Sequence, residues 1–437
     1  MSEGFHAVDL RGHIPQLDGV RGAAIILVLL HHIARSLEHE FRLDSDLLEL
    51  MQFGWCGVDL FFVLSGFLIT GILYESKLKS QYLRNFYVRR VLRIFPLYFM
   101  ALAVVQLLRH TWSQPNLFGY GDPIWMWTYL TNVYIAVQGF GAFGMVDHFW
   151  SLAVEEHFYL VWPFAVLIGN RRQLMALATA IILIALSSRI IIALYQGPAQ
   201  ILEAKSAMLY VLTPLRMDSL ALGGLIALAA RGEGGIKWLI PLARMALVAA
   251  LVVLSLVVLI ARGLDHDHPL VQTIGLSVLA LGFGAVLVLS IGAAFLARVF
   301  AHGALRWFGK YSYGMYVWHP IIFILVWHSD VGRALRGGNS ALHIVASTAT
   351  ALSITLVVTL LSFHLWEKRF LTLKRYFDSP SAGPTPEVER TTVTEAQQIT
   401  PCTDAAAPAV GQTAALEVVQ GTVPTEAGGT MTAAQGR

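Results

Sequence analysis

The chain has 437 residues, of which 56% are hydrophobic and only 14% are charged, and its mean hydropathy is +0.61. This composition excludes a soluble globular protein, which would carry far more charge, and it indicates a polytopic helical membrane protein. The net charge of +3 comes mostly from short loops between apolar runs, which is typical of membrane topology and argues against a nucleic-acid partner.

Apolar runs of about 17 to 25 residues predict about ten membrane spans, so we expect an all-α transmembrane helical bundle. An aromatic segment that begins at Ile124 is shorter than a span, and we expect an interfacial or re-entrant helix there. If this segment crossed the membrane, it would add one more span. The apolar runs cover residues 17–38, 53–76, 94–112, 149–169, 174–196, 207–230, 238–261, 270–297, 306–328 and 341–365.

Basic residues favour one side of these spans. Residues 84–93 carry four arginines, and further basic groups follow at Arg171, at Lys310 and in residues 368–375. Since cytoplasmic loops carry the excess of Lys and Arg, both termini are predicted to lie in the cytoplasm. The N-terminal segment shows no pattern of a cleavable signal peptide.

Residues 378–437 differ in composition from the rest of the chain. They contain seven acidic and two basic residues and no aromatic residue, and they are rich in Thr, Ala, Gly and Pro. Such a segment cannot bury enough apolar area to offset its ordering entropy. We therefore predict a disordered cytoplasmic tail here and one membrane-embedded domain over residues 1–377.

The first span carries two ionisable residues, Arg21 and His32. They are eleven positions apart, which places them on nearly the same helix face and roughly 16 Å apart along its axis. An ionisable group in lipid costs several kcal/mol unless it faces a protein interior or a water-filled cavity. We interpret this pair as functional. The alternative is an interfacial arginine that reaches the headgroups and a histidine that only packs.

Arg90 and Arg93 stand three residues apart, so their guanidinium groups project from one helix face. Arginine binds phosphate through two parallel hydrogen bonds, which indicates a clamp for a polyanionic cytoplasmic ligand. A loop that sets topology and meets lipid phosphates is the alternative.

An acidic segment opens the fourth span. His148, Ser151 and Glu155 share one helix face at this spacing, whereas Glu156 points elsewhere. The alternative is structural: Asp147 or His148 caps the helix, and Glu155 in an early turn interacts favourably with the positive end of the helix dipole. Capping explains one carboxylate better than it explains the whole group.

Two later spans also contain polar groups. Arg216 and Asp218 begin one span, and opposite charges inside an apolar stretch predict a structural ion pair between spans. Tyr316 and His319 stand three residues apart before Pro320, which interrupts the helical hydrogen bonds. A histidine at such a break either reaches a cavity or caps the break.

Motifs for other chemistries are missing from the sequence. Cys56 and Cys402 are too few and too far apart for a disulfide framework. The chain contains no HExxH, CxxC, GxSxG or phosphate-loop motif, so no metal is expected.

Taken together, the motifs resemble those of the acyltransferase-3 family, the integral-membrane O-acyltransferases of bacteria. The resemblance covers about residues 12–375, and the motifs stand in the order typical of the family. They are LDGVRG, GVDLFFVLSGFLI, FYVRRVLRIFPLY, HFWSLAVEEHFYLVWP, TPLRMDSLALGG and GKYSYGMYVWHP.

The resemblance assigns several residues to family motifs. Arg21 and His32 correspond to the Arg-and-His motif, and Arg90 and Arg93 correspond to the Arg-x-x-Arg motif. The acidic motif contains His148, Ser151, Glu155 and Glu156.

Two positions depart from the family pattern. The family commonly has Gln where His157 stands, which puts a specific role for this position in doubt. It often has Pro where Arg369 stands, which concerns only a helix end. Some relatives carry a C-terminal esterase-like domain, and we expect none in this chain.

The family implies an acyl-CoA donor, most often acetyl-CoA, and a location in the bacterial cytoplasmic membrane. We expect Arg90 and Arg93 to hold the CoA phosphates. We expect His32 to remove a hydroxyl proton from the acceptor or to carry the acyl group itself. Glu155 or Glu156 would orient the imidazole of His32 if their helix packs against the first span.

The family also implies a carbohydrate acceptor, such as a surface polysaccharide or a lipid-linked sugar. We expect Arg21 to stabilise negative charge on the donor or the oxyanion. Substrate-binding roles are expected for His148, Ser151, Tyr316 and His319. Two alternatives remain, namely a transporter or flippase that uses the same charged residues, and an inactive relative that acts as an assembly partner.

Overall fold

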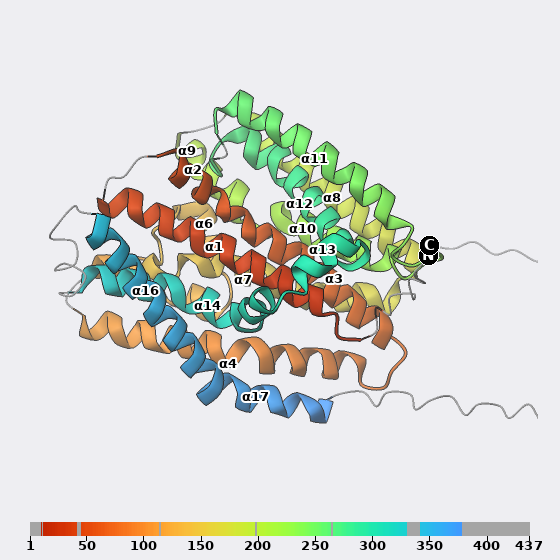
Figure 1. Ribbon diagram of the computed structural model, residues 1–437, viewed down its shortest axis with the longest axis horizontal. Coiled ribbons are helices and arrows are strands. Elements are labelled where there is room, and N and C mark those ends of the chain that lie inside the picture. The colour runs from red at the N-terminus through yellow and green to blue at the C-terminus, as the bar shows by residue number, and fades with distance from the viewer. Residues whose placement is uncertain are drawn as a thin grey trace, which may run out of the picture. The chain divides into compact units, whose positions relative to one another are not determined.

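The computed structural model describes residue 10 and residues 12–41, 45–112, 115–196, 199–263, 265–329 and 341–377. Within these ranges the chain forms helices and no strand, as the sequence predicts (Figure 1). The predicted disordered tail, residues 378–437, lies outside the described residues.

Within the ranges given above, ten helices have 17 residues or more. They are α1 (Pro15–Phe41), α3 (Gly57–Ser76), α4 (Tyr82–Thr111), α7 (Trp150–Ile168), α8 (Arg171–Leu194), α10 (Thr213–Ala229), α11 (Leu239–Ala261), α12 (Leu276–Gly292), α14 (Gly303–His328) and α16 (Ala341–Ser362). Shorter helices connect or extend them: α2 (Asp46–Gln52), η1 (Phe53–Cys56), η2 (Pro115–Phe118), α5 (Ile124–Trp127), α6 (Thr131–Gln138), η3 (Gly144–Phe149), α9 (Ala199–Val211), η4 (Val271–Gly275), α13 (Ala294–Phe300), η5 (Phe363–Glu367), α17 (Lys368–Leu373) and η6 (Lys374–Phe377).

Nine helical runs among the described residues are long and apolar enough to cross a membrane, and they match nine of the predicted spans. The remaining predicted span is α14, which is 26 residues long but less apolar, because its first half carries Lys310 and several tyrosines. Nearly every side chain from Tyr311 to Phe323 is buried by other helices. Polar side chains are tolerated at such positions because they face protein and not lipid.

The aromatic segment after Ile124 forms α5 and α6, which are 4 and 8 residues long and therefore too short to span a membrane. Helix α6 is nevertheless buried on one side, where Asn132 donates hydrogen bonds to Val211 O and Thr213 Oγ1. The segment is thus a non-spanning element that packs against the end of α9 and the start of α10.

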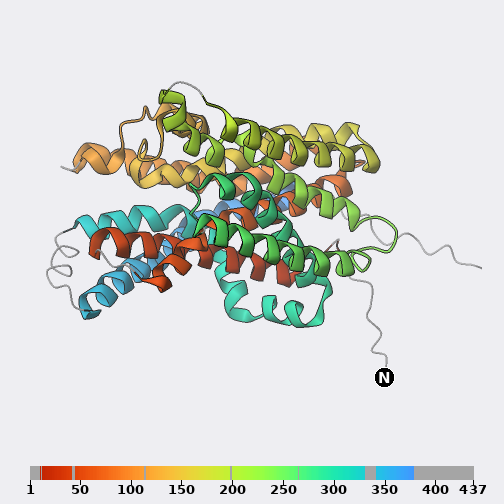
Figure 2. The ribbon, with the colours of Figure 1, turned by 90° about the horizontal axis from the view of Figure 1, so that it is seen from above.

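Glycines bring the central helices into backbone contact, and α1 packs against α14 while α3 packs against α10 (Figures 1 and 2). A Cβ atom at Gly22 of α1 would overlap the Leu305 carbonyl, and one at Gly309 of α14 would overlap the Asp18 carbonyl. Small residues at helix contacts allow this close approach in membranes. The glycines therefore fix how α1 and α14 are aligned.

The charged residues of α10 are held by ion pairs to other spans, as the sequence predicts. Arg216 lies 2.8 Å from Asp59 of α3, and Asp218 lies 2.6 Å from Arg189 of α8. Ser277 also donates a hydrogen bond to Asp218, at 3.1 Å. All four charged side chains are almost completely buried. We call Asp59, Arg189, Arg216 and Asp218 the ion-paired cluster.

Candidate active site

Helix α1 contributes to three cavities in succession along its length. Arg21 lines the first cavity, His32 lines the second and Glu38 lines the third. At a rise of about 1.5 Å per residue, Arg21 and Glu38 are about 25 Å apart along the helix axis. This distance is most of the roughly 30 Å thickness of a bilayer's hydrocarbon core. The three cavities therefore follow one another along the direction in which α1 runs.

The first cavity, which we call the arginine cavity, has a volume of about 110 Å³. Its walls come from α1, α3, α4, α7 and α14, so helices far apart in sequence converge on it. Its charged lining residues are Arg21, Arg90, Arg93, Glu155 and Glu156. Ser151 and Tyr316 also line it. Most of the residues that the sequence singled out therefore meet in one chamber.

Arg90 and Arg93 of this cavity form no close ion pair within the part of the chain that the structure describes, although Glu155 and Glu156 line the same cavity. No carboxylate of the described residues lies within 4.0 Å of Arg90 or Arg93, and Arg21 has only Asp18, at 3.6 Å. The buried Nε of Arg90 has no hydrogen-bond partner among the described residues. Instead, the Arg90 guanidinium lies 5.9 Å from the centre of the Tyr159 ring. Because unpaired charge in a bilayer is costly, the cavity suits an anionic ligand.

The two glutamates of this cavity differ in their surroundings. The hydroxyl of Tyr159 donates a hydrogen bond to Glu155 Oε2 at 3.0 Å and shares another with Ser65. Glu156 Oε1 is buried and has no partner among the described residues. Glu155 is thus fixed in position, whereas Glu156 retains an open acceptor.

The second cavity, which we call the histidine cavity, has a volume of about 500 Å³. His32 lines it from α1, and His148 lines it from η3. The cavity is larger than the arginine cavity and has several polar groups in a mainly apolar lining. Its other polar lining residues are His31, Arg35, Asp147, Tyr210, His266, Asp267 and Tyr316.

Hydrogen bonds define which nitrogen of His32 is basic. Nδ1 of His319 lies 2.8 Å from Met315 O and donates to it, so Nε2 of His319 is an acceptor. Nδ1 of His32 lies 3.3 Å from that acceptor and 3.0 Å from Val28 O, so it carries the proton and donates. This assignment follows from the hydrogen-bond network. Nε2 of His32 is then left with the lone pair that a general base needs.

The partner that orients His32 differs from the expectation. Neither Glu155 nor Glu156 hydrogen-bonds to His32, because both glutamates line the arginine cavity. His319 takes this position from α14, where it is completely buried and lines none of the three cavities. Sequence reasoning found His319 but assigned it to the substrate and not to His32.

A thin polar partition separates the arginine and histidine cavities, which share Tyr316 and Val58 as lining residues. The Tyr316 hydroxyl donates to His148 O at 2.9 Å and shares a hydrogen bond with Ser151. Ser151 lines the arginine cavity and His148 the histidine cavity. The tyrosine hydroxyl therefore stands where a group would pass from one chamber to the other.

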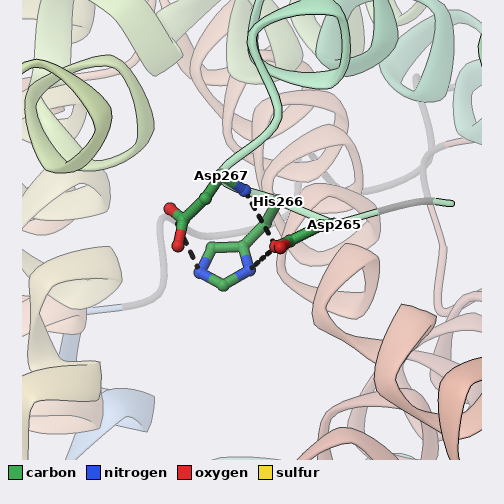
Figure 3. Close-up of side chains that lie close together, drawn as sticks. All are labelled: Asp265, His266 and Asp267. Carbon is green, nitrogen blue, oxygen red and sulfur yellow. Dashed lines mark hydrogen bonds and ion pairs between the residues drawn. The ribbon is translucent and has the colours of Figure 1, made fainter. Parts of the chain in front are cut away.

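The third cavity, which we call the loop cavity, has a volume of about 430 Å³ and lies between the C-terminal part of α1, α2 and the loop after α11. His266 of that loop lies between two carboxylates (Figure 3). Its Nδ1 is 3.2 Å from Asp265 and its Nε2 is 3.6 Å from Asp267. The hydrogen bond from His266 lowers the pKa of Asp265 to about 2.

Sequence reasoning missed this loop, although its alternating Asp and His residues were a visible signal. The ligand atoms of Asp265, His266 and Asp267 lie within 4.8 Å of one another, so they are the described group closest to a metal-binding arrangement. However, both ring nitrogens of His266 already face carboxylates. A metal would have to replace these contacts.

Comparison with known proteins agrees with the motifs. The family profile described as "Acyltransferase domain" matches residues 14–366. Peptidoglycan O-acetyltransferase OatA of Listeria monocytogenes is 29% identical over 329 residues, which is 71% of this chain and 50% of the relative. O-acetyltransferase OatA of Staphylococcus aureus is 25% identical over 334 residues, or 72% of this chain and 51% of the relative.

The Bacillus subtilis protein YrhL is 27% identical over 392 residues, which is 84% of this chain and 56% of YrhL. The chain thus spans about half the length of the curated relatives it matches. No solved structure matches the protein. Because the family profile covers most of the chain, the protein belongs to the acyltransferase-3 family.

Proposed function

We propose that this protein is a membrane O-acetyltransferase that moves an acetyl group from acetyl-CoA, or another acyl group from its acyl-CoA, to a hydroxyl of a carbohydrate acceptor. The observation that carries the proposal is the arrangement of two adjoining cavities. One contains arginines without carboxylate partners, the other contains His32 with a basic Nε2, and Tyr316 lies between them. All three relatives described above have names that identify them as O-acetyltransferases, and two of these names specify peptidoglycan.

Arginine chemistry supports a CoA donor. CoA carries several phosphates, and guanidinium groups bind phosphate through paired, charge-assisted hydrogen bonds. Arg21, Arg90 and Arg93 supply three such groups around one cavity. The cavity of about 110 Å³ holds only part of such a donor. The acyl end would then reach the partition at Tyr316 from the side that the basic loops predict to be cytoplasmic.

His32 would act as the general base for the acceptor hydroxyl. Nε2 of His32 takes the proton of the acceptor hydroxyl, whose oxygen forms a bond to the thioester carbonyl carbon. The carbon–sulfur bond then breaks, and the CoA thiolate leaves and takes up the proton held by His32, which restores the neutral imidazole. The hydroxyls of Tyr316 and Ser151 lie at the partition, and either would donate to the oxyanion once it gives up its hydrogen bond to the His148 carbonyl. Direct transfer and an acyl-His32 intermediate both fit this arrangement.

A transporter or flippase is the second candidate, because the three cavities succeed one another along α1. Such a protein would move a substrate across the membrane without forming or breaking an acyl bond. The two functions differ in whether the label of a donor ends up covalently bound to an acceptor.

The test uses native membranes that contain wild-type protein, His32→Ala or His110→Ala, supplied with radiolabelled acetyl-CoA. His110 is an exposed residue of α4 that lines none of the three cavities, so it is the matched control. We expect labelled glycan with wild type and His110→Ala and none with His32→Ala, at equal protein levels. Turnover by His32→Ala would refute the assignment. No label from acetyl-CoA or longer acyl-CoAs would favour transport.

A further inference from the structure

We propose that the loop cavity is an acceptor subsite that holds the sugar ring next to the one being acylated. The acceptor is accordingly an oligosaccharide of at least two linked rings. This inference rests on the proposed function, since it extends the acceptor side of the same site.

The connection between the cavities carries the inference. The loop cavity shares five lining residues with the histidine cavity and none with the arginine cavity. A hydroxyl that reaches His32 must lie in the histidine cavity. A second ring attached to the first and directed away from the arginine cavity can therefore enter the loop cavity. The shared residues are His31, Arg35, Trp55, His266 and Asp267.

Each of the two cavities is large enough for at least one sugar ring. Their volumes of about 500 Å³ and 430 Å³ both lie within the roughly 300–1,000 Å³ that is usual for small-molecule sites. A monosaccharide would use only the chamber that contains His32. The second chamber, which is equally well formed, would then have no role in binding.

The lining of the loop cavity suits hydroxyl groups and not an acyl chain. Glu38 and Glu49 supply carboxylate acceptors, and Arg35 and Arg262 supply donors. Gln52 donates to Glu38 at 2.9 Å, which holds that carboxylate in place. Sugar hydroxyls both donate and accept hydrogen bonds, so they match a wall that contains carboxylate acceptors and guanidinium donors.

The loop that closes this cavity is anchored, so the subsite is formed before a ligand arrives. Ser206 of α9 donates to Asp267 at 2.7 Å, and Gln272 of η4 donates to Ser206 Oγ at 2.9 Å. Gln272 is only 1% exposed. Asp267 in turn faces His266, which stands in the wall between the two cavities (Figure 3). A preorganised wall lowers the cost of binding.

The experiment compares acceptors of increasing length, namely monosaccharide, disaccharide and tetrasaccharide fragments of the glycan that wild-type membranes label. Purified full-length protein is used with acetyl-CoA. The variants are Glu49→Gln and Arg262→Gln, both at exposed positions in the wall. Asp46→Asn is the matched control, because Asp46 is an exposed carboxylate of the same helix as Glu49 and lines none of the three cavities.

We expect wild-type kcat/KM to rise about tenfold or more from monosaccharide to disaccharide, the factor expected of one hydrogen bond to a charged group. Glu49→Gln and Arg262→Gln should lose this gain through a higher KM and should keep the wild-type rate with the monosaccharide. Asp46→Asn should behave as wild type.

Equal kcat/KM for monosaccharide and disaccharide, with unchanged variants, would overturn this inference and leave the acetyltransferase proposal intact. An equal loss with both acceptors would also overturn it, because the residues would then not form a separate subsite. Absence of transfer to any acceptor, together with absence of CoA release, would overturn the proposed function and this inference with it.

Discussion

The ion-paired cluster and the arginine cavity use arginine and carboxylate side chains between packed helices for opposite purposes. In the cluster, each arginine lies within 2.8 Å of an aspartate, and the side chains exclude solvent almost completely. In the cavity, Arg90 and Arg93 have no carboxylate of the described residues within 4.0 Å. The partner, and not the charge, therefore decides whether an intramembrane arginine stabilises the fold or is available to a ligand.

The largest effect is expected from breaking the ion-paired cluster. Asp59→Leu leaves Arg216 buried without its partner, which should lower the free energy of unfolding by about 3–5 kcal/mol. Thermal unfolding of the detergent-purified protein measures this loss. The double variant Asp59→Leu, Arg216→Met should recover most of it, because neither charge then remains. A single variant as stable as wild type would show that the pair does not support the fold.

The arginine cavity should respond in the opposite way. Arg90→Gln removes a charge that has no carboxylate partner, so thermal stability should stay unchanged or rise slightly. The KM for acetyl-CoA should rise about 10- to 100-fold, as for a lost hydrogen bond to a charged group. Arg84→Gln is the control, because Arg84 is an exposed residue of the same helix outside the cavity. A loss of stability like that of Asp59→Leu would make Arg90 a structural residue.

Substitution of two tyrosines of α14 distinguishes a role in catalysis from a role in packing. Tyr316 donates to His148 O and lines both cavities, whereas Tyr313 donates to Ile94 O and lines only the arginine cavity. Each change to Phe should cost about 0.5–1.5 kcal/mol of stability. Only Tyr316→Phe should also lower the transfer rate, by about tenfold. Equal rates for the two variants would remove Tyr316 from the transfer step.

The smallest effect concerns the exposed carboxylate at the loop cavity. The hydrogen bond from His266 lowers the pKa of Asp265 from 3.8 to about 2. Stability from this contact is therefore complete above pH 4 and is lost only as the pH falls through about 2. From pH 5 to 8 Asp265 does not titrate. The pH–rate profile of Asp265→Asn should keep its wild-type shape in this range, and a new inflection would contradict this.

Much of the fold followed from the sequence because apolar runs of sufficient length leave few choices in a bilayer. Helix α14 was also predicted as a span, but its tyrosines and Lys310 leave it without a stretch as apolar as those of the other nine. Its polarity is tolerated because α1 and other helices bury it. The motifs also predicted the residues of the site, and most of these residues line the arginine cavity.

What the sequence could not provide was the pairing of side chains across helices. Asp59 and Arg189 gave no signal that they hold Arg216 and Asp218. Helical spacing likewise could not show that His319, 287 residues after His32, is its hydrogen-bond partner in place of a glutamate. Such contacts depend on which helices pack together and in what register, and local periodicity carries no information on either.

The contact between α1 and α14 has a consequence for how the site tolerates mutation. His32 stands ten residues after Gly22, and His319 stands ten residues after Gly309. The backbone contacts at the two glycines therefore set the alignment that brings the imidazoles together about 15 Å further along. The relative position of the two imidazoles therefore depends on residues that have no side chain. A methyl group added at Gly22 would wedge the helices apart and act as an active-site mutation from outside the active site.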